Sequence, residues 1–216
     1  MGFDTRVRQA VDIIYVKRDF AAGQEAFQML WKAAEEGDGD ACLLLARCYG
    51  GSCFVDERFQ YEVNDELRDE YFNRSIELGS AAGMLCASRL GGFTPRCGCL
   101  IHDPYKSPRE VWDAVVKLAL EGELFCELLI ANAYYYGDAL FYMDLDEGIT
   151  YEEKRAILGK MTIAARDMYE DLYSKGMMMA PYNYRNIVTS GDYNVPKSNA
   201  RNEWLTEMCQ EHNIDL

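Results

Sequence analysis

Apolar residues recur every three or four positions along several stretches of the chain, and each stretch ends at a glycine. In the clearest one, apolar side chains stand at positions 26, 29, 30, 33 and 34, and Gly37 follows. This spacing places the apolar residues on one face of an α-helix. A glycine just past the last turn supplies the left-handed backbone that ends a helix. Apolar residues then resume at Leu44, Leu45 and Cys48, so the pattern predicts a second helix after the glycine.

The same pattern occurs four times along the chain. The glycines that set its register are Gly37, Gly79, Gly122 and Gly176, spaced by 42, 43 and 54 residues. Eight and seven residues before each glycine stand two apolar residues, namely Met29-Leu30, Tyr71-Phe72, Ala114-Val115 and Met168-Tyr169. Four residues after it stands a small residue: Ala41, Gly83, Cys126 or Ala180. Each unit is therefore predicted to be a helical hairpin with an apolar face that it buries only by stacking on its neighbours.

These units suggest a single helical-repeat domain over residues 1–216. The expected parts are an N-terminal capping helix in 1–23, repeat 1 with its connector in 24–64, repeat 2 with its connector in 65–107, repeat 3 with its connector in 108–150, repeat 4 in 151–195, and a C-terminal capping helix in 196–216. Terminal units of a repeat array need a polar outer face, and both end segments have one.

The segment from Glu25 to Tyr49 resembles a Sel1-like repeat, a relative of the tetratricopeptide repeat. The third copy, from Val111 to Gly137, resembles it less closely, and the second departs at Arg68 and Gly91. The fourth copy is the most degenerate, and the copies together cover roughly three quarters of the chain. The resemblance implies an all-α fold, a right-handed α-α superhelix (solenoid) of about four hairpins between capping helices. It also implies that the first helices of the hairpins line an inner, concave surface.

The charge balance bears on the partner that such a surface would bind. Acidic residues outnumber basic ones 36 to 22, for a net charge of −14. Binding to nucleic acid needs clustered Lys and Arg, so the charge argues against that partner and suits a basic peptide or protein, although it also serves solubility. No apolar run reaches the length of a membrane span, and the first ten residues lack the apolar core of a signal peptide. We therefore expect a cytoplasmic chain without structural disulfides.

Candidate binding residues lie ten and six positions before the glycines, beside the apolar face of each first helix. They are Phe27 with Trp31, Asp69 with Asn73, and Trp112 with Val116. In the first and third copies these positions are large and apolar where an exposed helix face is normally polar. Exposed aromatics there would anchor a bound peptide, because aromatics dominate interface hot spots. The alternative is that the long connectors or the terminal helices fold over them.

Candidate chemistry is sparse. The chain has two histidines, and it lacks the nucleophile-elbow, phosphate-loop and zinc-protease motifs. The best metal candidate is the run from Cys97 through Cys99 to His102, with Cys53 or Cys86 as a fourth ligand. Its spacing differs from a C-x2-C pair, and an ordinary connector explains it as well.

The sequence therefore favours a non-catalytic scaffold that binds a protein or peptide and needs no cofactor. The main alternative is a zinc-binding or thiol-dependent enzyme, or a redox sensor, centred on Cys97, Cys99 and His102. A structural subunit that associates with itself is a third hypothesis.

Overall fold

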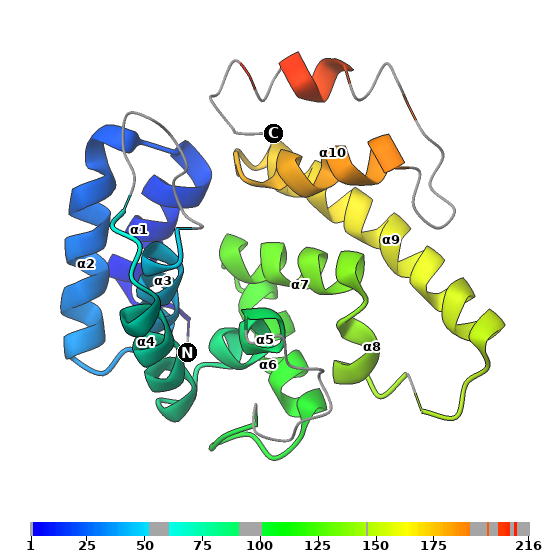
Figure 1. Cartoon of the computed structure of the whole chain (residues 1–216), viewed down its shortest axis with the longest axis horizontal. Helices are drawn as coiled ribbons and strands as arrows, with labels where there is room; N and C mark the ends of the chain where they lie inside the picture. Colours follow the sequence, from blue (N-terminus) through cyan, green and yellow to red (C-terminus); the bar gives the residue numbers. More distant parts are fainter. Residues whose placement is uncertain are drawn as a thin grey trace. The chain divides into compact units, whose positions relative to one another are not determined.

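The computed structural model describes residues 2–51, 61–90, 101–145, 147–190, 198, 203–207 and 210, and these residues contain helices and no strand. The helices are α1 (Thr5–Val11), the π-helical turn η1 (Asp12–Lys17), the 3-10 turn η2 (Phe20–Ala22), α2 (Gly23–Glu35), α3 (Gly39–Tyr49), α4 (Asp65–Glu77), α5 (Ala81–Leu90), α6 (Pro108–Leu120), α7 (Leu124–Tyr136), α8 (Ala139–Tyr142), α9 (Tyr151–Ser174) and α10 (Ala180–Ser190) (Figure 1).

The helices group into two compact units, residues 1–126 and 127–216, with the boundary inside α7. In the first unit α2 packs against α3, α3 against α4, and α5 against α4 and α6, so successive hairpins stack. In the second unit α9 and α10 pair as the fourth hairpin. The predicted all-α array of stacked helical hairpins is confirmed by these helices. A single domain over residues 1–216 stays a prediction.

The four glycines of the sequence register end four helices in the same way. Their φ angles are +91° at Gly37, +80° at Gly79, +95° at Gly122 and +89° at Gly176. At the first, the Gly37 amide donates to the Ala34 carbonyl (3.0 Å) and the Asp38 amide to the Ala33 carbonyl (3.0 Å). This pair of bonds is the Schellman motif. The same two bonds recur at 2.9–3.1 Å at the other three glycines, so the predicted stops are confirmed.

The small residue four positions after the glycine also has a structural reason. In the second hairpin, a Cβ added to Gly83 would lie 2.2 Å from Ser75 Oγ and 3.2 Å from Ser75 Cβ. Ser75 belongs to α4 and Gly83 to α5, so the two helices of the hairpin approach more closely than a larger side chain would permit.

Replacing Gly37 by alanine isolates the conformational contribution of the stop, because a Cβ there meets no atom within 4 Å. We expect the free energy of unfolding to fall by about 1 to 2 kcal/mol, the cost of a left-handed backbone for a residue with a Cβ. Asparagine tolerates this conformation better, so Gly37→Asn should cost less. Urea denaturation of the three proteins measures both values, and equal losses for alanine and asparagine would contradict the interpretation.

The N-terminal segment is helical from Thr5 to Lys17, and its role as a cap of the array stays a prediction. Val7, Ile14 and Tyr15 are fully buried. The helix widens to a π-helix over Asp12–Lys17 and ends at Arg18, whose φ is +50°. Tyr15 also contacts residues beyond the first helix of repeat 1. Its ring lies 5.0 Å from that of Phe125, and its hydroxyl accepts a 2.8 Å hydrogen bond from Arg47 Nε.

The first two connectors lie partly outside the described residues, and the predicted bounds of all three stay a prediction. α3 ends at Tyr49 and α4 begins at Asp65, while α5 ends at Leu90 and α6 begins at Pro108. The third connector differs, because the short helix α8 forms within it. Four cysteines of these helices are buried: Cys42, Cys48, Cys86 and Cys126. Within the described ranges, no helix has both the length and the apolar character that crossing a membrane requires.

Candidate functional site

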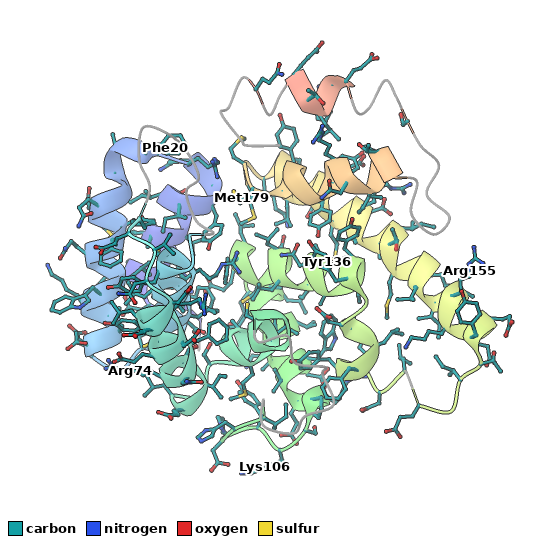
Figure 2. The ribbon with its side chains drawn as sticks, in the orientation of Figure 1. Phe20, Arg74, Lys106, Tyr136, Arg155 and Met179 are labelled. Carbon is teal, nitrogen blue, oxygen red and sulfur yellow. The ribbon has the colours of Figure 1, made fainter. Side chains whose placement is uncertain are left out.

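The first helices of repeats 1 and 2 run in the same direction and are in contact at their C-terminal ends. Near the start of α2, the Tyr61 hydroxyl donates a 2.7 Å hydrogen bond to the Gly23 carbonyl. Near its end, Arg74 Nη2 of α4 donates a 2.8 Å bond to the Ala34 carbonyl. Figure 2 labels Arg74 where the two helices end. Because the two contacts match the helices start to start and end to end, α2 and α4 are parallel.

Trp31 is the most prominent side chain on the surface formed by α2 and α4. Its side chain is 43% exposed. It lies one helical turn before Glu35, which forms a 3.4 Å ion pair with Arg74. Glu70 lies one turn before Arg74. The indole and the Glu70 carboxylate are therefore at the same level of two parallel helices. We call the surface formed by Phe27, Trp31, Glu66 and Glu70 the α2/α4 face.

Phe27, one turn before Trp31, is partly covered. Its ring lies 5.5 Å from Tyr49, edge on, and 5.6 Å from Tyr61. Tyr61 comes from the end of the first connector, so a connector does fold over this position. Among the described residues, no ring covers the indole of Trp31 in this way. The two alternatives left open by the sequence thus apply to different residues of the same helix.

The charge on the α2/α4 face is unbalanced. Arg68 pairs with its neighbours Asp65 and Asp69 on α4, and Arg74 pairs with Glu35. Glu66 and Glu70 are exposed, stand one turn apart, and form no ion pair or hydrogen bond with the described part of the chain. Like charges at this spacing destabilise a helix slightly, so two unpaired carboxylates here are available to an external cation.

The aromatic residues beneath this surface lie close to its carboxylates. Tyr49 stacks on Tyr71, with ring centroids 5.8 Å apart. Burial raises the pKa of the Tyr71 phenol above its ordinary value, and the negative charges of Glu35 and Glu70 raise it further. The pKa of Tyr49 is likewise raised, first by burial and then by its neighbours, which include Glu62 and Glu70. Both phenols therefore stay neutral hydrogen-bond donors at physiological pH.

The other predicted binding residues differ in their exposure to solvent. Asn73 is exposed, Asp69 is exposed but paired with Arg68 at 2.8 Å, and Val116 is partly buried. Trp112 is only 3% exposed, so the expectation of an exposed aromatic there is wrong. The buried face of α6 includes this position together with Val111, Val115 and Ala119.

The candidate metal and thiol residues are mostly outside the described residues. Cys53, Cys97 and Cys99 fall there, while His102 is described and exposed. Cys86, the other candidate fourth ligand, is buried in α5. Within the described ranges, no group of three or more His, Cys, Asp or Glu side chains is placed to hold a metal ion.

Glu66 and Glu70 are not among the binding residues that the sequence predicted. Both precede the register glycine of their repeat, in a helix whose five acidic residues outnumber its two arginines. The signal available in the sequence was the four-residue spacing of the two carboxylates, which places them on one face of α4, whereas Arg68 between them lies on another face.

Comparison with known proteins gives matches among solved structures alone. No protein-family model matches the chain, and no curated protein matches it. A Sel1 repeat protein from Oxalobacter formigenes is 16% identical, with a TM-score of 0.37 and coverage of 88% of this chain and 65% of its own. A protective antigen of uropathogenic Escherichia coli strains that displays an SLR fold is 15% identical, with a TM-score of 0.28 and coverage of 94% and 45%.

The chain thus spans about two thirds or less of the solved structures that it matches. Because both TM-scores are low, the evidence for a family lies in the repeats of the chain itself. Four hairpins end in the same glycine-centred motif, and three of them follow one another at nearly constant spacing in the first unit. In this repeated hairpin, the chain resembles the Sel1-like repeat family.

Proposed function

We propose that the chain is a non-catalytic scaffold that binds a basic peptide or protein segment on its α2/α4 face. The observation that carries the proposal is the exposure of Trp31, 43% of whose surface is open to solvent although it lies on a packed helix. An exposed indole on a rigid helix is well suited to anchor a partner, because aromatic anchors lose little conformational entropy on binding and dominate interface energies.

Charge supports a basic partner. Glu70 stands at the level of the indole on the parallel helix, Glu66 lies one turn before it, and neither side chain forms an ion pair with the described part of the chain. A lysine or arginine of the partner would pair with them and lie against the face of the Trp31 ring, an arrangement favoured by the cation–π interaction. Because these carboxylates are exposed, their contribution should fall as salt is added.

The proposal is tested with displayed peptides selected on the immobilised full chain. We expect the selected peptides to be rich in Lys and Arg. Their dissociation constant should rise at least tenfold for Trp31→Ala, since truncating a hot spot costs about 2 kcal/mol or more. Fluorescence anisotropy measures this change, and thermal melting checks that the variant folds.

Trp204 offers the matched control. Its side chain is 37% exposed, and it packs edge on against Tyr173 in the second unit. Trp204→Ala should leave peptide affinity unchanged, which would exclude general adhesion to exposed tryptophan. Peptides that bind Trp31→Ala as tightly as the unmodified protein would refute the α2/α4 face as the binding surface.

A further inference from the structure

Helix α9 is far longer than its hairpin partner. It contains 24 residues, whereas α10 contains 11 and the corresponding first helices α2, α4 and α6 contain 13 each. At 1.5 Å per residue, α9 is about 36 Å long and α10 about 17 Å. The two helices meet at the C-terminal end of α9, so its N-terminal half extends well beyond α10, as Figure 1 shows.

One face of α9 changes character along its length. In the C-terminal half this face is buried and includes Ala165, Tyr169 and Leu172. Followed toward the N-terminus at helical spacing, the same face passes Leu158, which contacts Gly137, and reaches Tyr151, Lys154 and Arg155. Tyr151 is 74% exposed, and both basic side chains are exposed. The face that packs inside the unit thus continues without a partner for two turns.

These two turns are helical for local reasons and therefore preformed. Thr150 and Glu153 make a reciprocal capping box, in which Glu153 Oε2 accepts from the Thr150 amide (2.8 Å) and the Glu153 amide donates to Thr150 Oγ1 (3.3 Å). A capping box fixes the helix start without tertiary contacts. The Glu153 carboxylate is occupied in this way, while the side chains of Lys154 and Arg155 make no ion pair or hydrogen bond with the described residues.

We propose that the first two turns of α9 bind the α2/α4 face of a second copy of this chain. Charge complementarity selects this occupant. The chain as a whole carries a charge of −14, yet Lys154 and Arg155 are adjacent, exposed and unpaired beside an exposed tyrosine. Figure 2 shows the Arg155 side chain directed away from the helix. On the receiving surface, Glu66 and Glu70 are unpaired carboxylates one turn apart, beside exposed Trp31.

The two surfaces belong to different parts of the chain, so the contact is heterologous and joins copies head to tail. Its strength comes from opposite charges on exposed surfaces, while the net charge of −14 repels the copies from each other. The association should therefore depend on both ionic strength and protein concentration. It rests on the proposed function in using the same α2/α4 face, and a copy bound there would compete with any basic partner.

The experiment measures the weight-average mass of the full chain by light scattering over a range of concentrations at low salt. The unmodified protein should exceed its monomer mass of 24.7 kDa as concentration rises. Two neutralised variants should remain monomeric under the same conditions. One is the pair Lys154→Gln with Arg155→Gln, and the other is the pair Glu66→Gln with Glu70→Gln. Circular dichroism confirms that both fold.

Mixing the two variants gives the decisive result. Each retains the surface that the other lacks, so an equimolar mixture should form a one-to-one dimer that cannot grow further. A monomeric unmodified protein at all concentrations, or continued association of the α9 variant, would overturn the proposal. The peptides selected for the α2/α4 face should still bind the α9 variant with unchanged affinity. Loss of self-association and loss of partner binding are thereby separated.

Discussion

Replacing Glu123 by alanine is expected to lower the free energy of unfolding of the first unit by about 3 kcal/mol, because one buried carboxylate oxygen ties the N-terminal helix to the start of α7. The Glu123 side chain is 5% exposed. Its Oε1 atom accepts hydrogen bonds from the Phe3 amide (2.9 Å), from Arg8 Nε (2.9 Å) and from Arg8 Nη2 (2.6 Å). Alanine removes all three bonds and leaves the buried amide of Phe3 unpaired.

Guanidinium denaturation monitored at the first unit measures the loss, and hydrogen exchange at Val7 and Ala10 reports directly whether α1 detaches. Glu36→Ala is the matched control. Glu36 also accepts from an arginine of α1, Arg6 Nη2 at 2.7 Å, but its side chain is 65% exposed. Exposed ion pairs are screened by solvent, so this variant should change stability far less. If Glu123→Ala lowered the free energy of unfolding as little as Glu36→Ala, α1 would be held by its apolar residues alone.

The helical hairpins could be predicted from the sequence because their determinants are local. A glycine such as Gly37 ends its helix through bonds to residues three to five positions earlier, and an apolar face repeats within each turn. The position of the N-terminal helix could not be predicted in this way. The Arg8 and Glu123 pair joins residues separated by 115 positions, and Tyr15 meets Phe125 across a similar interval. No pattern within one repeat encodes such contacts.

At the candidate site, too, the local sequence predicts the helix face of a residue but not its exposure. Trp31 and Trp112 both belong to the predicted binding positions of their repeats, yet one is 43% exposed and the other 3%. Their local sequences do not separate them, because exposure depends on what packs against each helix from elsewhere in the chain. Phe27 is a further example, because Tyr61, the residue that covers it, belongs to the connector. The pattern predicts which residues share a helix face, and tertiary packing decides which of them a partner reaches.

Asp40 stands apart from these contacts because its charge opposes folding. It lies in the first turn of α3, and its carboxylate accepts a 2.5 Å hydrogen bond from the Ser80 hydroxyl of the next hairpin. Burial raises the pKa of Asp40 to about 6, the Ser80 hydrogen bond lowers it in part, and the charges of Asp38 and Glu123 raise it further. Tyr105 is also near, and its pKa is raised first by burial and then by Asp40.

The folded chain therefore binds a proton at Asp40 more tightly than the unfolded chain, whose aspartates titrate near their ordinary value of 3.8. Stability falls with rising pH over the range in which the folded state holds more protons than the unfolded state. This group therefore favours folding below about pH 4 and loses that contribution as pH rises to about 6. Asp40→Asn keeps an acceptor for Ser80 and removes the charge. We expect the variant to equal the unmodified protein at pH 4 and to exceed it by about 2 to 3 kcal/mol above pH 7, at 1.36 kcal/mol for each unit of pKa.

Urea denaturation at several pH values tests this expectation, and Asp38→Asn is its control. Asp38 caps α3 by accepting a 2.8 Å bond from the Ala41 amide, and asparagine caps a helix about as well. The control should therefore show a small difference that changes little with pH. If Asp40→Asn showed the same flat profile, the Asp40 carboxylate would have to be hydrated in the folded chain, and the edge of the hairpin stack formed by Asp40, Ser80 and Tyr105 would be open to water. A difference that grows between pH 4 and 6 and then stays constant identifies Asp40 as the group that titrates, because the gain appears only where the unmodified carboxylate is ionised.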